Sequence, residues 1–161
     1  MKFNTVLHEL RSAKNVGMIA RSHLSFGGEY LILIGDKNKW NFKGGPSTYT
    51  RKINEAEKLL FFKDFDSFLN WNKNAVNIAV EIAEESALSS TYKYPENCNI
   101  ILGNEGTGLE NSIVEKCDQT VTIPQFGAIG SLNVAVSASI VLYELNKNRG
   151  QIATIKGAKF T

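Results

Sequence analysis

Two apolar strands in the second half of the chain each lead into a glycine-rich loop and then into a helix, and this pattern limits the fold most. Residues 99–109 read Asn-Ile-Ile-Leu-Gly-Asn-Glu-Gly-Thr-Gly-Leu, and residues 120–133 read Thr-Val-Thr-Ile-Pro-Gln-Phe-Gly-Ala-Ile-Gly-Ser-Leu-Asn. α/β proteins build their sites from such loops at the carboxyl ends of strands. The stretch from Asn99 to Leu145 is therefore expected to carry the chemistry.

Strand and helix patterns alternate along the whole chain. Short apolar runs predict strands at Tyr30–Gly35, Lys58–Lys63, Val76–Glu81, Ile100–Gly103 and Thr120–Ile123. Helical spacing or capping residues predict helices over Asn15–Gly28, Asp66–Asn72 and Val134–Asn148, with a short polar helix between the two glycine loops. This alternation predicts an α/β fold with a mainly parallel sheet flanked by helices.

The first predicted helix has Asn15 as its N-cap, and Gly27 and Gly28 end it. Its spacing places Arg21 and His23 away from the most apolar stripe. The last predicted helix begins at a cap for which Ser131 and Asn133 compete, because one N-cap needs only one side chain. At least one of these two side chains is therefore expected to remain free for a ligand.

Length and composition predict one domain over residues 1–161, since 161 residues, 43% of them hydrophobic, suffice for one core but not two. The charged N-terminal residues do not resemble a signal peptide, and no apolar run is long enough to span a bilayer. We therefore expect a cytoplasmic protein without membrane contact. Cys98 and Cys117 lie far apart and form no metal-binding pattern, so we expect reduced thiols and no metal.

The net charge of +2 leaves the partner open, because nucleic-acid binding depends on where the cations lie. Residues 36–52 interleave lysines and arginine with aromatic side chains, which suits either contact with RNA or a solvated loop. Residues 150–161 are expected to form a loose basic tail, with an RNA-contacting arm as the alternative.

The first glycine loop is neither of the two common nucleotide motifs. Gly103, Gly106 and Gly108 do not have the Gly-x-Gly-x-x-Gly spacing, and no Gly-Lys-Ser/Thr follows them. A glycine loop without lysine still lets backbone groups approach a flat neutral ring such as a purine. Glu81, at the carboxyl end of its predicted strand, is placed where it could face the same site.

Three ordered motifs resemble those of the SpoU/TrmH-type RNA 2′-O-ribose methyltransferases of the SPOUT superfamily. They are Asn15-Val-Gly-x-x-x-Arg21, Gly103-Asn-Glu-x-x-Gly-Leu109 and Ile123-Pro-Gln…Ser131-Leu-Asn-Val-Ala-Val-Ser137. The resemblance extends from Asn15 to Arg149 and is greatest to the branch that methylates guanosine in the D-loop of tRNA.

The resemblance implies a deep trefoil knot at the C-terminal end of the sheet, a rare exception among folds. It further implies S-adenosyl-L-methionine as cofactor, RNA as substrate, with tRNA preferred, and a homodimer with each active site near the subunit interface. The cofactor would be held, largely through backbone groups, by Leu102, Gly103, Ile123, Ser131 and Leu132.

The resemblance also implies catalytic roles for Arg21, Asn15, Glu105, Ser131 and Asn133. Arg21 stays protonated in proteins, so we expect it to hold a phosphate and stabilise alkoxide charge while a phosphate or water takes the proton. Asn15 would orient Arg21 or the ribose, and Ser131 and Asn133 would position the ribose and the cofactor loop. Glu105 would fix the loop or pair with Arg21; the structural alternative is that it caps amides of its own loop.

Several alternatives remain open from the sequence. The same reaction could act on rRNA or at the tRNA wobble position. A knotted RNA-binding module without catalysis would bind RNA but transfer no methyl group. A small α/β nucleotide-binding protein would instead prefer ATP or NAD.

Overall fold

The structure is a computed structural model that describes residues 1–36 and 48–147. These residues form a seven-stranded sheet in the order β3-β2-β1-β6-β4-β7-β5, and neighbouring strands pair in parallel throughout. The strands are β1 Lys2–His8, β2 Leu31–Ile34, β3 Leu59–Phe62, β4 Val76–Val80, β5 Ala87–Leu88, β6 Asn97–Leu102 and β7 Gln119–Thr122. The predicted mainly parallel α/β sheet is confirmed.

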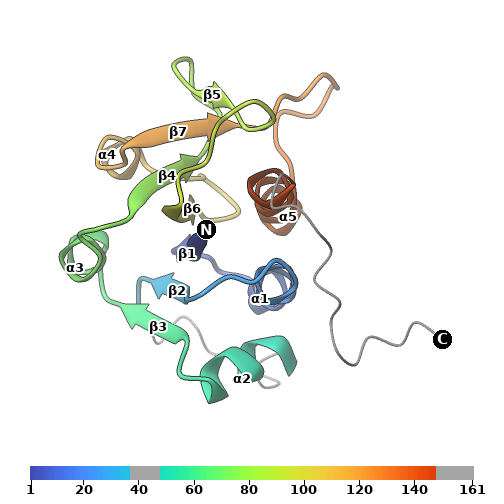
Figure 1. Cartoon of the computed structure of the whole chain (residues 1–161). Coiled ribbons are helices and arrows are strands. Elements are labelled where there is room, and N and C mark those ends of the chain that lie inside the picture. Colours follow the sequence, from blue (N-terminus) through green and yellow to red (C-terminus); the bar gives the residue numbers. More distant parts are fainter. Residues whose placement is uncertain (37–47, 148–161) are drawn as a thin grey trace.

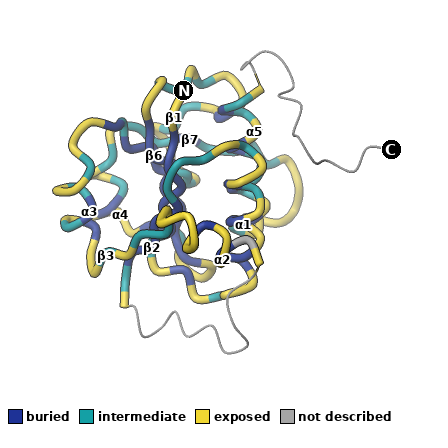
Figure 2. Tube along the Cα trace, turned by 60° about the horizontal axis from the view of Figure 1, so that its bottom comes forward, coloured by how far each residue is buried: buried dark blue, intermediate teal, exposed yellow. Residues whose placement is uncertain are grey.

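Helices cover both faces of this sheet (Figure 1). They are α1 Ala13–Ser25, α2 Thr48–Glu55, α3 Phe65–Trp71, α4 Asn111–Val114 and α5 Val134–Asn146. On one face, α1, α2 and α5 pack apolar side chains such as Ile19 and Leu142 against the strands. On the other face, α3 and α4 do so with Phe68 and Ile113. Figure 2 shows the central strands as the most deeply buried part of the fold, as expected for a parallel sheet.

The central strand β1 was absent from the sequence prediction. Its residues include Asn4 and Thr5, which interrupt the apolar run yet are buried in the structure. Asn4 Nδ2 donates to Asn99 Oδ1 at 2.8 Å, and Asn99 Nδ2 donates to Asn77 Oδ1 at 2.7 Å. These bonds join β1, β6 and β4 side by side, so partners distant in sequence satisfy the polar groups that burial would otherwise leave unpaired.

Two other elements also differ from the prediction. Residues 48–55 form α2, although residues 36–52 were expected to be a loop, and the pair Ala87–Leu88 adds the edge strand β5. Residues 37–47 and the predicted tail 150–161 lie outside the described residues.

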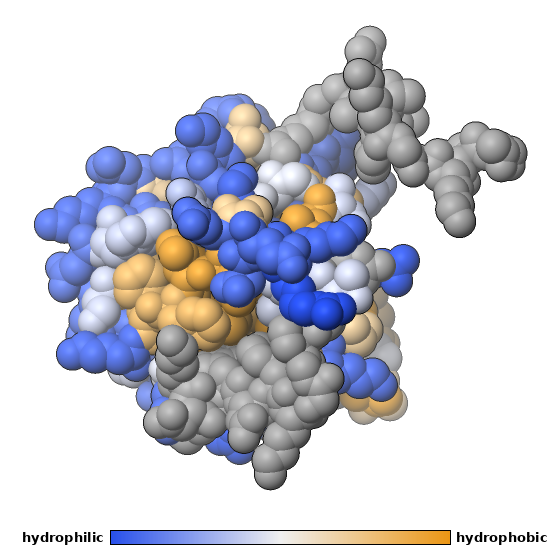
Figure 3. All heavy atoms as spheres, turned by 90° about the horizontal axis from the view of Figure 1, so that it is seen from below, coloured by the Kyte–Doolittle hydropathy of each residue, from blue (hydrophilic) through white to orange (hydrophobic). Residues whose placement is uncertain are grey.

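At the opposite edge from β5, β3 carries Phe61 at 36% exposure, and apolar atoms gather on the lower side of the molecule (Figure 3).

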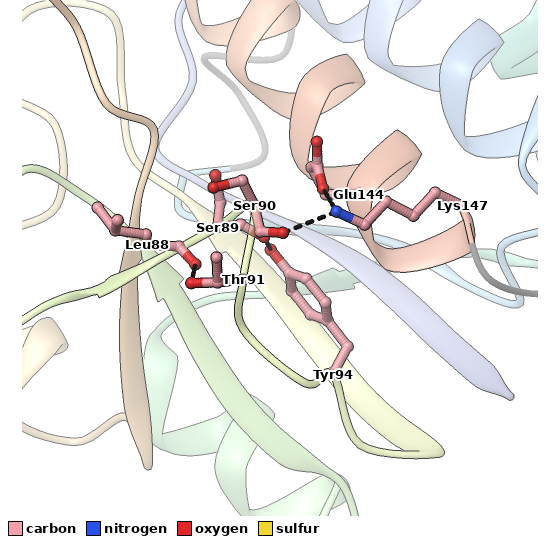
Figure 4. A network of polar contacts seen from close by, with 7 residues as sticks. All are labelled: Leu88, Ser89, Ser90, Thr91, Tyr94, Glu144 and Lys147. Carbon is pink, nitrogen blue, oxygen red and sulfur yellow. Dashed lines mark hydrogen bonds and ion pairs between the residues drawn. The ribbon is translucent and has the colours of Figure 1, made fainter.

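The far end of α5 is tied to the segment that follows β5 (Figure 4). Lys147 Nζ donates to the carbonyl oxygen of Ser90 at 2.7 Å and also pairs with Glu144. Tyr94 lies in the same network, with its hydroxyl 3.4 Å from the carbonyl oxygen of Ser89. Burial raises the pKa of Tyr94, so the hydroxyl stays a neutral donor. The Lys147 contacts fix the C-terminal end of α5.

Within the described residues, no helix is long and apolar enough to cross a membrane. In the same part of the chain, no three His, Cys, Asp or Glu residues lie close enough to hold a metal ion together. Cys98 is buried and Cys117 half-buried, and neither forms a disulfide among the described residues. The cytoplasmic location, the single domain over 1–161 and the trefoil knot stay predictions.

Candidate active site

A cavity of about 480 Å³ lies at the carboxyl ends of β4, β6 and β7, beside the start of α5. This is the edge of the sheet at which the sequence predicted a site, and the volume is in the range usual for small-molecule pockets. The end of β4, both glycine-rich segments and the first turns of α5 line it: Val80, Glu81, Ile82, residues 102–108, Ile123, Gln125, residues 130–134 and Ser137.

The loop after β6 is folded around its own asparagine. Asn104 Oδ1 accepts hydrogen bonds from the backbone nitrogens of Gly106 at 2.9 Å and Thr107 at 3.0 Å, while Asn104 Nδ2 donates to Thr107 Oγ1 at 2.8 Å. Such a turn fixes the backbone without help from the rest of the protein. Gly103 is required beside it, because a Cβ atom there would lie 2.1 Å from the backbone carbon of Gly108.

Glu81 joins the end of β4 to this loop. Its Oε2 accepts from the backbone nitrogen of Leu109 at 2.8 Å, and its Oε1 accepts from its neighbour Ile82 at 3.0 Å. Gly108 adopts a φ of 68°, and a Cβ atom there would lie 2.3 Å from Glu81 Oε2. The carboxylate thus lies against a backbone that only glycine fits, and Glu81 lines the pocket.

Glu105 connects the loop to the start of α1. Its carboxylate accepts from the backbone nitrogens of Arg11 at 2.9 Å and Ser12 at 3.0 Å, and from Asn15 Nδ2 at 2.9 Å. Partial burial raises the pKa of Glu105, but these bonds outweigh it and the net pKa is lowered. Glu105 therefore caps amides before α1, and a hydrogen bond from its own backbone amide also lowers its pKa.

The two asparagines of the predicted site are in contact. Asn133 is the N-cap of α5, because its Oδ1 accepts from the backbone nitrogen of Ala135 at 2.9 Å. Its Nδ2 donates to Asn15 Oδ1 at 3.3 Å. Since Asn133 takes the cap, the exposed Ser131 hydroxyl has no hydrogen-bond partner among the described residues and lies at the pocket, as the competition between them predicted.

The N-cap of α1 was predicted wrongly. Ser12 caps the helix, with its hydroxyl accepting from the backbone nitrogen of Asn15 at 3.3 Å, so α1 begins two residues before Asn15. This frees the Asn15 side chain for the contacts with Glu105 and Asn133. The sequence did offer a signal for this cap, because Ser12 is of a preferred N-cap type and lies three residues before Asn15.

Seven of the predicted site residues line one pocket: Leu102, Gly103, Glu105, Ile123, Ser131, Leu132 and Asn133. Asn15 touches two of them. Arg21 lies exposed on α1 and is not among the residues that line this pocket.

His23 does not point away from the core, as the helical spacing suggested, but is buried against β1. The helix buries a wider face than the most apolar stripe, because Thr5 on β1 offers the ring a polar partner.

Sequence reasoning assigned no role to Asn104, Gln125 or Ser137, which also line the pocket. For Asn104 the signal was available, since an asparagine two residues before a glycine favours this type of turn. For Gln125 and Ser137 the signal was their place in the third motif, Ile123-Pro-Gln…Val-Ser137.

The charge of the pocket limits what it can bind. Two carboxylates, Glu81 and Glu105, line it, and none of the described residues that line it is a lysine, arginine or histidine. A di- or triphosphate would meet acceptors and no cation, which is unfavourable. A ligand with an apolar ring, hydroxyl groups and positive charge fits better, since Val80, Leu102 and Ile123 supply the apolar walls.

Comparison with known proteins gives the family. A profile described as the SpoU rRNA Methylase family matches residues 2–143. A 23S rRNA (guanosine-2′-O-)-methyltransferase of Coxiella burnetii is 30% identical over 149 residues, covering 89% of this chain and 58% of that protein. A tRNA (guanosine(18)-2′-O)-methyltransferase of Aquifex aeolicus is 33% identical over 96 residues, covering 60% of this chain and 42% of that protein.

A solved structure, described as an AdoMet-bound rRNA methyltransferase from Sinorhizobium meliloti, has the same fold. It matches with a TM-score of 0.76 at 22% identity, over 93% of this chain and 57% of that one. The present chain spans about half the length of the curated relatives that it matches. The resemblance read from the three motifs is confirmed, and the chain belongs to the SpoU rRNA Methylase family.

Proposed function

We propose that the protein is an S-adenosylmethionine-dependent methyltransferase that acts on a ribose 2′-hydroxyl of tRNA. The observation that carries this proposal is the pocket with two carboxylates and no cation among its described lining residues. S-adenosylmethionine, when bound, supplies a methyl group from a positively charged sulfonium. The electrostatics of the pocket favour such a cationic nucleoside over ATP or NAD.

Backbone groups would hold much of the cofactor. Leu102, Ile123 and Leu132 line the pocket with apolar side chains that suit a purine ring, and Gly103 would let the ring approach the backbone. Ser131 has a free hydroxyl at the same pocket and would orient the cofactor loop or the ribose. In this proposal the two glycine segments belong to a deep trefoil knot; the insertion of β6 between β1 and β4 and the close approach of Gly103 to Gly108 support it.

Glu105, Asn15 and Asn133 would act as a positioning group. Their hydrogen bonds link the cofactor loop, the start of α1 and the start of α5. Methyl transfer is an in-line displacement, so the acceptor oxygen must be held in line with the methyl carbon and the leaving sulfur. A rigid connection between the two helix starts and the loop suits that demand.

Arg21 would act from a second copy of the chain. It is exposed on α1 and does not line the pocket of its own protomer. The exposed faces of α1 and α5 also carry apolar side chains, with Met18 46%, Val136 42% and Tyr143 57% exposed. Because such a surface favours association, we include a homodimer in the proposal.

The guanidinium of Arg21 cannot serve as a base at physiological pH. It would instead hold the phosphate beside the target ribose and stabilise the negative charge that develops on the 2′ oxygen. The proton would pass to that phosphate or to water. Arg21→Lys should therefore lower kcat by about 10- to 100-fold, since the forked donor is lost while one charge remains. Near-full turnover by this variant would contradict the role.

The experiment is methyl transfer from labelled S-adenosylmethionine to unmodified tRNA and rRNA transcripts, with the modified position mapped by its resistance to alkaline hydrolysis. We expect label on a tRNA ribose. A matched transcript with a 2′-deoxy nucleotide at the mapped position should accept no label. Methylation of a base, or of protein, would contradict the proposal.

A second candidate substrate is rRNA, because the relative from Coxiella burnetii is a 23S rRNA enzyme that matches most of this chain. The same assay separates the two substrates. The alternative of an inactive module predicts RNA binding without methyl transfer. The alternative of a nucleotide-binding protein predicts that calorimetry detects binding of ATP or NAD but not of S-adenosylmethionine.

A further inference from the structure

We propose that Arg11, Lys14 and Phe126 form a rim that binds the RNA chain beside the pocket, with the two cations on phosphates and the phenyl ring stacked on a base. This inference rests on the proposed function and adds the residues that bring the substrate to the site. All three side chains are exposed, and none belongs to the three motifs of the family resemblance.

Arg11 is fixed at the edge of the pocket by its backbone. Its nitrogen donates to Glu105 Oε2, and Glu105 lines the pocket. The Arg11 side chain is left exposed by this bond, because only the main chain takes part. Lys14 follows in the first turn of α1, directly before the buried Asn15. Two cations therefore flank the point at which the cofactor loop meets α1.

The two cations have no partner in the part of the chain that the structure describes. Arg11 and Lys14 have no ion pair and no side-chain hydrogen bond among the described residues, whereas Lys116 and Lys147 each pair with a carboxylate. The carboxylate of Glu105, which meets the Arg11 backbone, already accepts hydrogen bonds from two backbone amides and from Asn15. Unpaired cations beside an active pocket suit phosphates of a nucleic acid, which bind mainly through such charges.

Phe126 supplies a different kind of contact. It is 96% exposed and has no ring contact among the described residues, on the loop that joins β7 to α5 and projects from the body of the molecule (Figure 1). Its neighbour Gln125 lines the pocket, and on its other side a Cβ atom added to Gly127 would meet no atom within 4 Å. An open aromatic ring of this kind is a platform on which any base can stack.

These two kinds of contact commit the rim to a single-stranded or unpaired RNA segment. The cations match a polyanion, and the ring needs a base that is not already stacked in a duplex. Both Arg11 and Phe126 follow the carboxyl ends of parallel strands, β1 and β7, so they lie on the same edge of the sheet as the pocket.

The test measures binding of a fluorescein-labelled unmodified tRNA transcript by anisotropy over a series of salt concentrations. Arg11→Ala combined with Lys14→Ala should weaken binding and reduce the slope of log K against log salt by about 1.4 to 1.8, the value for two lost phosphate contacts. Phe126→Ala should weaken binding about 5- to 150-fold with an unchanged slope, and Phe126→Trp should restore it.

Matched controls keep the test specific. Lys73 and Lys93 are exposed and precede β4 and β6, at the opposite end of the sheet. Lys73→Ala combined with Lys93→Ala removes the same charge and should leave the slope within about 0.3 of the wild-type value, since it removes no phosphate contact. Binding of S-adenosylmethionine and the melting temperature should be unchanged in every variant, because each substitution leaves the backbone contacts of the pocket in place.

Several results would overturn the inference. One is an unchanged salt slope in the Arg11 and Lys14 variant, or an equal change in the control. Another is a change in the oligomeric state of Phe126→Ala in solution, which would show that the ring is a subunit contact. If the wild-type protein binds neither tRNA nor rRNA, the proposed function fails as well; if it binds and methylates RNA while the variants behave as wild type, only the rim is wrong.

Discussion

Replacement of His23 by asparagine should remove a defined part of the pH dependence of folding. The imidazole is 1% exposed, its Nδ1 lies 2.9 Å from Thr5 Oγ1, and it meets the ring of Phe3 edge-on with centroids 5.8 Å apart. A Cβ atom at Gly28 would lie 2.1 Å from this ring, so the site is closely packed. Asparagine can place a polar atom near the position of Nδ1 but does not titrate.

The magnitude follows from the pKa of the buried ring. Burial first, and then the charge of Lys58, lower the pKa of His23 from 6.5 to about 4. Between these values the unfolded chain binds a proton that the folded chain does not, so the free energy of unfolding falls as the pH falls. The loss is about 1.4 kcal/mol per pH unit and reaches about 3 kcal/mol by pH 4. Above pH 7 the contribution is complete.

The assay is urea unfolding of the wild type and of His23→Asn between pH 8 and pH 4.5. The wild type should be more stable at pH 8, and the difference in unfolding free energy should shrink by about 2.2 kcal/mol between pH 6.5 and 4.5. His8→Asn is the comparison: burial lowers the pKa of the half-buried His8 too, so the change has the same sign and a smaller size. A difference that stays constant with pH would refute the reasoning, since the ring would then titrate normally in the folded protein.

Two further predictions concern the loop after β6. Gly108→Ala places a Cβ atom 2.3 Å from Glu81 Oε2 at a φ of 68°, so we expect at least about tenfold weaker binding of S-adenosylmethionine by calorimetry. Gly127→Ala, which meets no atom within 4 Å, should bind normally; equal loss in both would contradict the steric reason. Glu105→Gln should lower the methylation rate about 10-fold or more by weakening three hydrogen bonds, whereas Glu110→Gln, with no cap bond, should not. Equal rates in these two variants would exclude a positioning role for Glu105.

The fold class, and the edge of the sheet at which the pocket lies, could both be predicted from the amino-acid sequence. Continuous apolar runs at 31–34, 78–80 and 100–102 can only be buried on both faces, which is the condition of a parallel sheet. Glycine loops directly after two such runs then had to meet at one edge. These patterns are local, so they can be recognised without knowing which residues pack against them in the folded protein.

The sequence did not predict the burial of elements whose polar residues bond to partners far away in the chain. The strand β1 contains Asn4, which is buried because Asn99, 95 residues away, accepts its hydrogen bond. His23 entered the core for the same reason, through Thr5. From composition alone such polar residues indicate a surface, because the partner that removes the cost of burial is not visible along the chain.

At the site, the sequence selected the residue types and the tertiary structure decided their partners. Both Ser131 and Asn133 were equally suited to the cap, and the packing of α5 beside α1 gave it to Asn133 because only that position also reaches Asn15. Glu105 contacts the amides before α1 in addition to its own backbone amide. Such choices depend on distances between elements remote in sequence, and only the folded sheet brings those elements within hydrogen-bond reach.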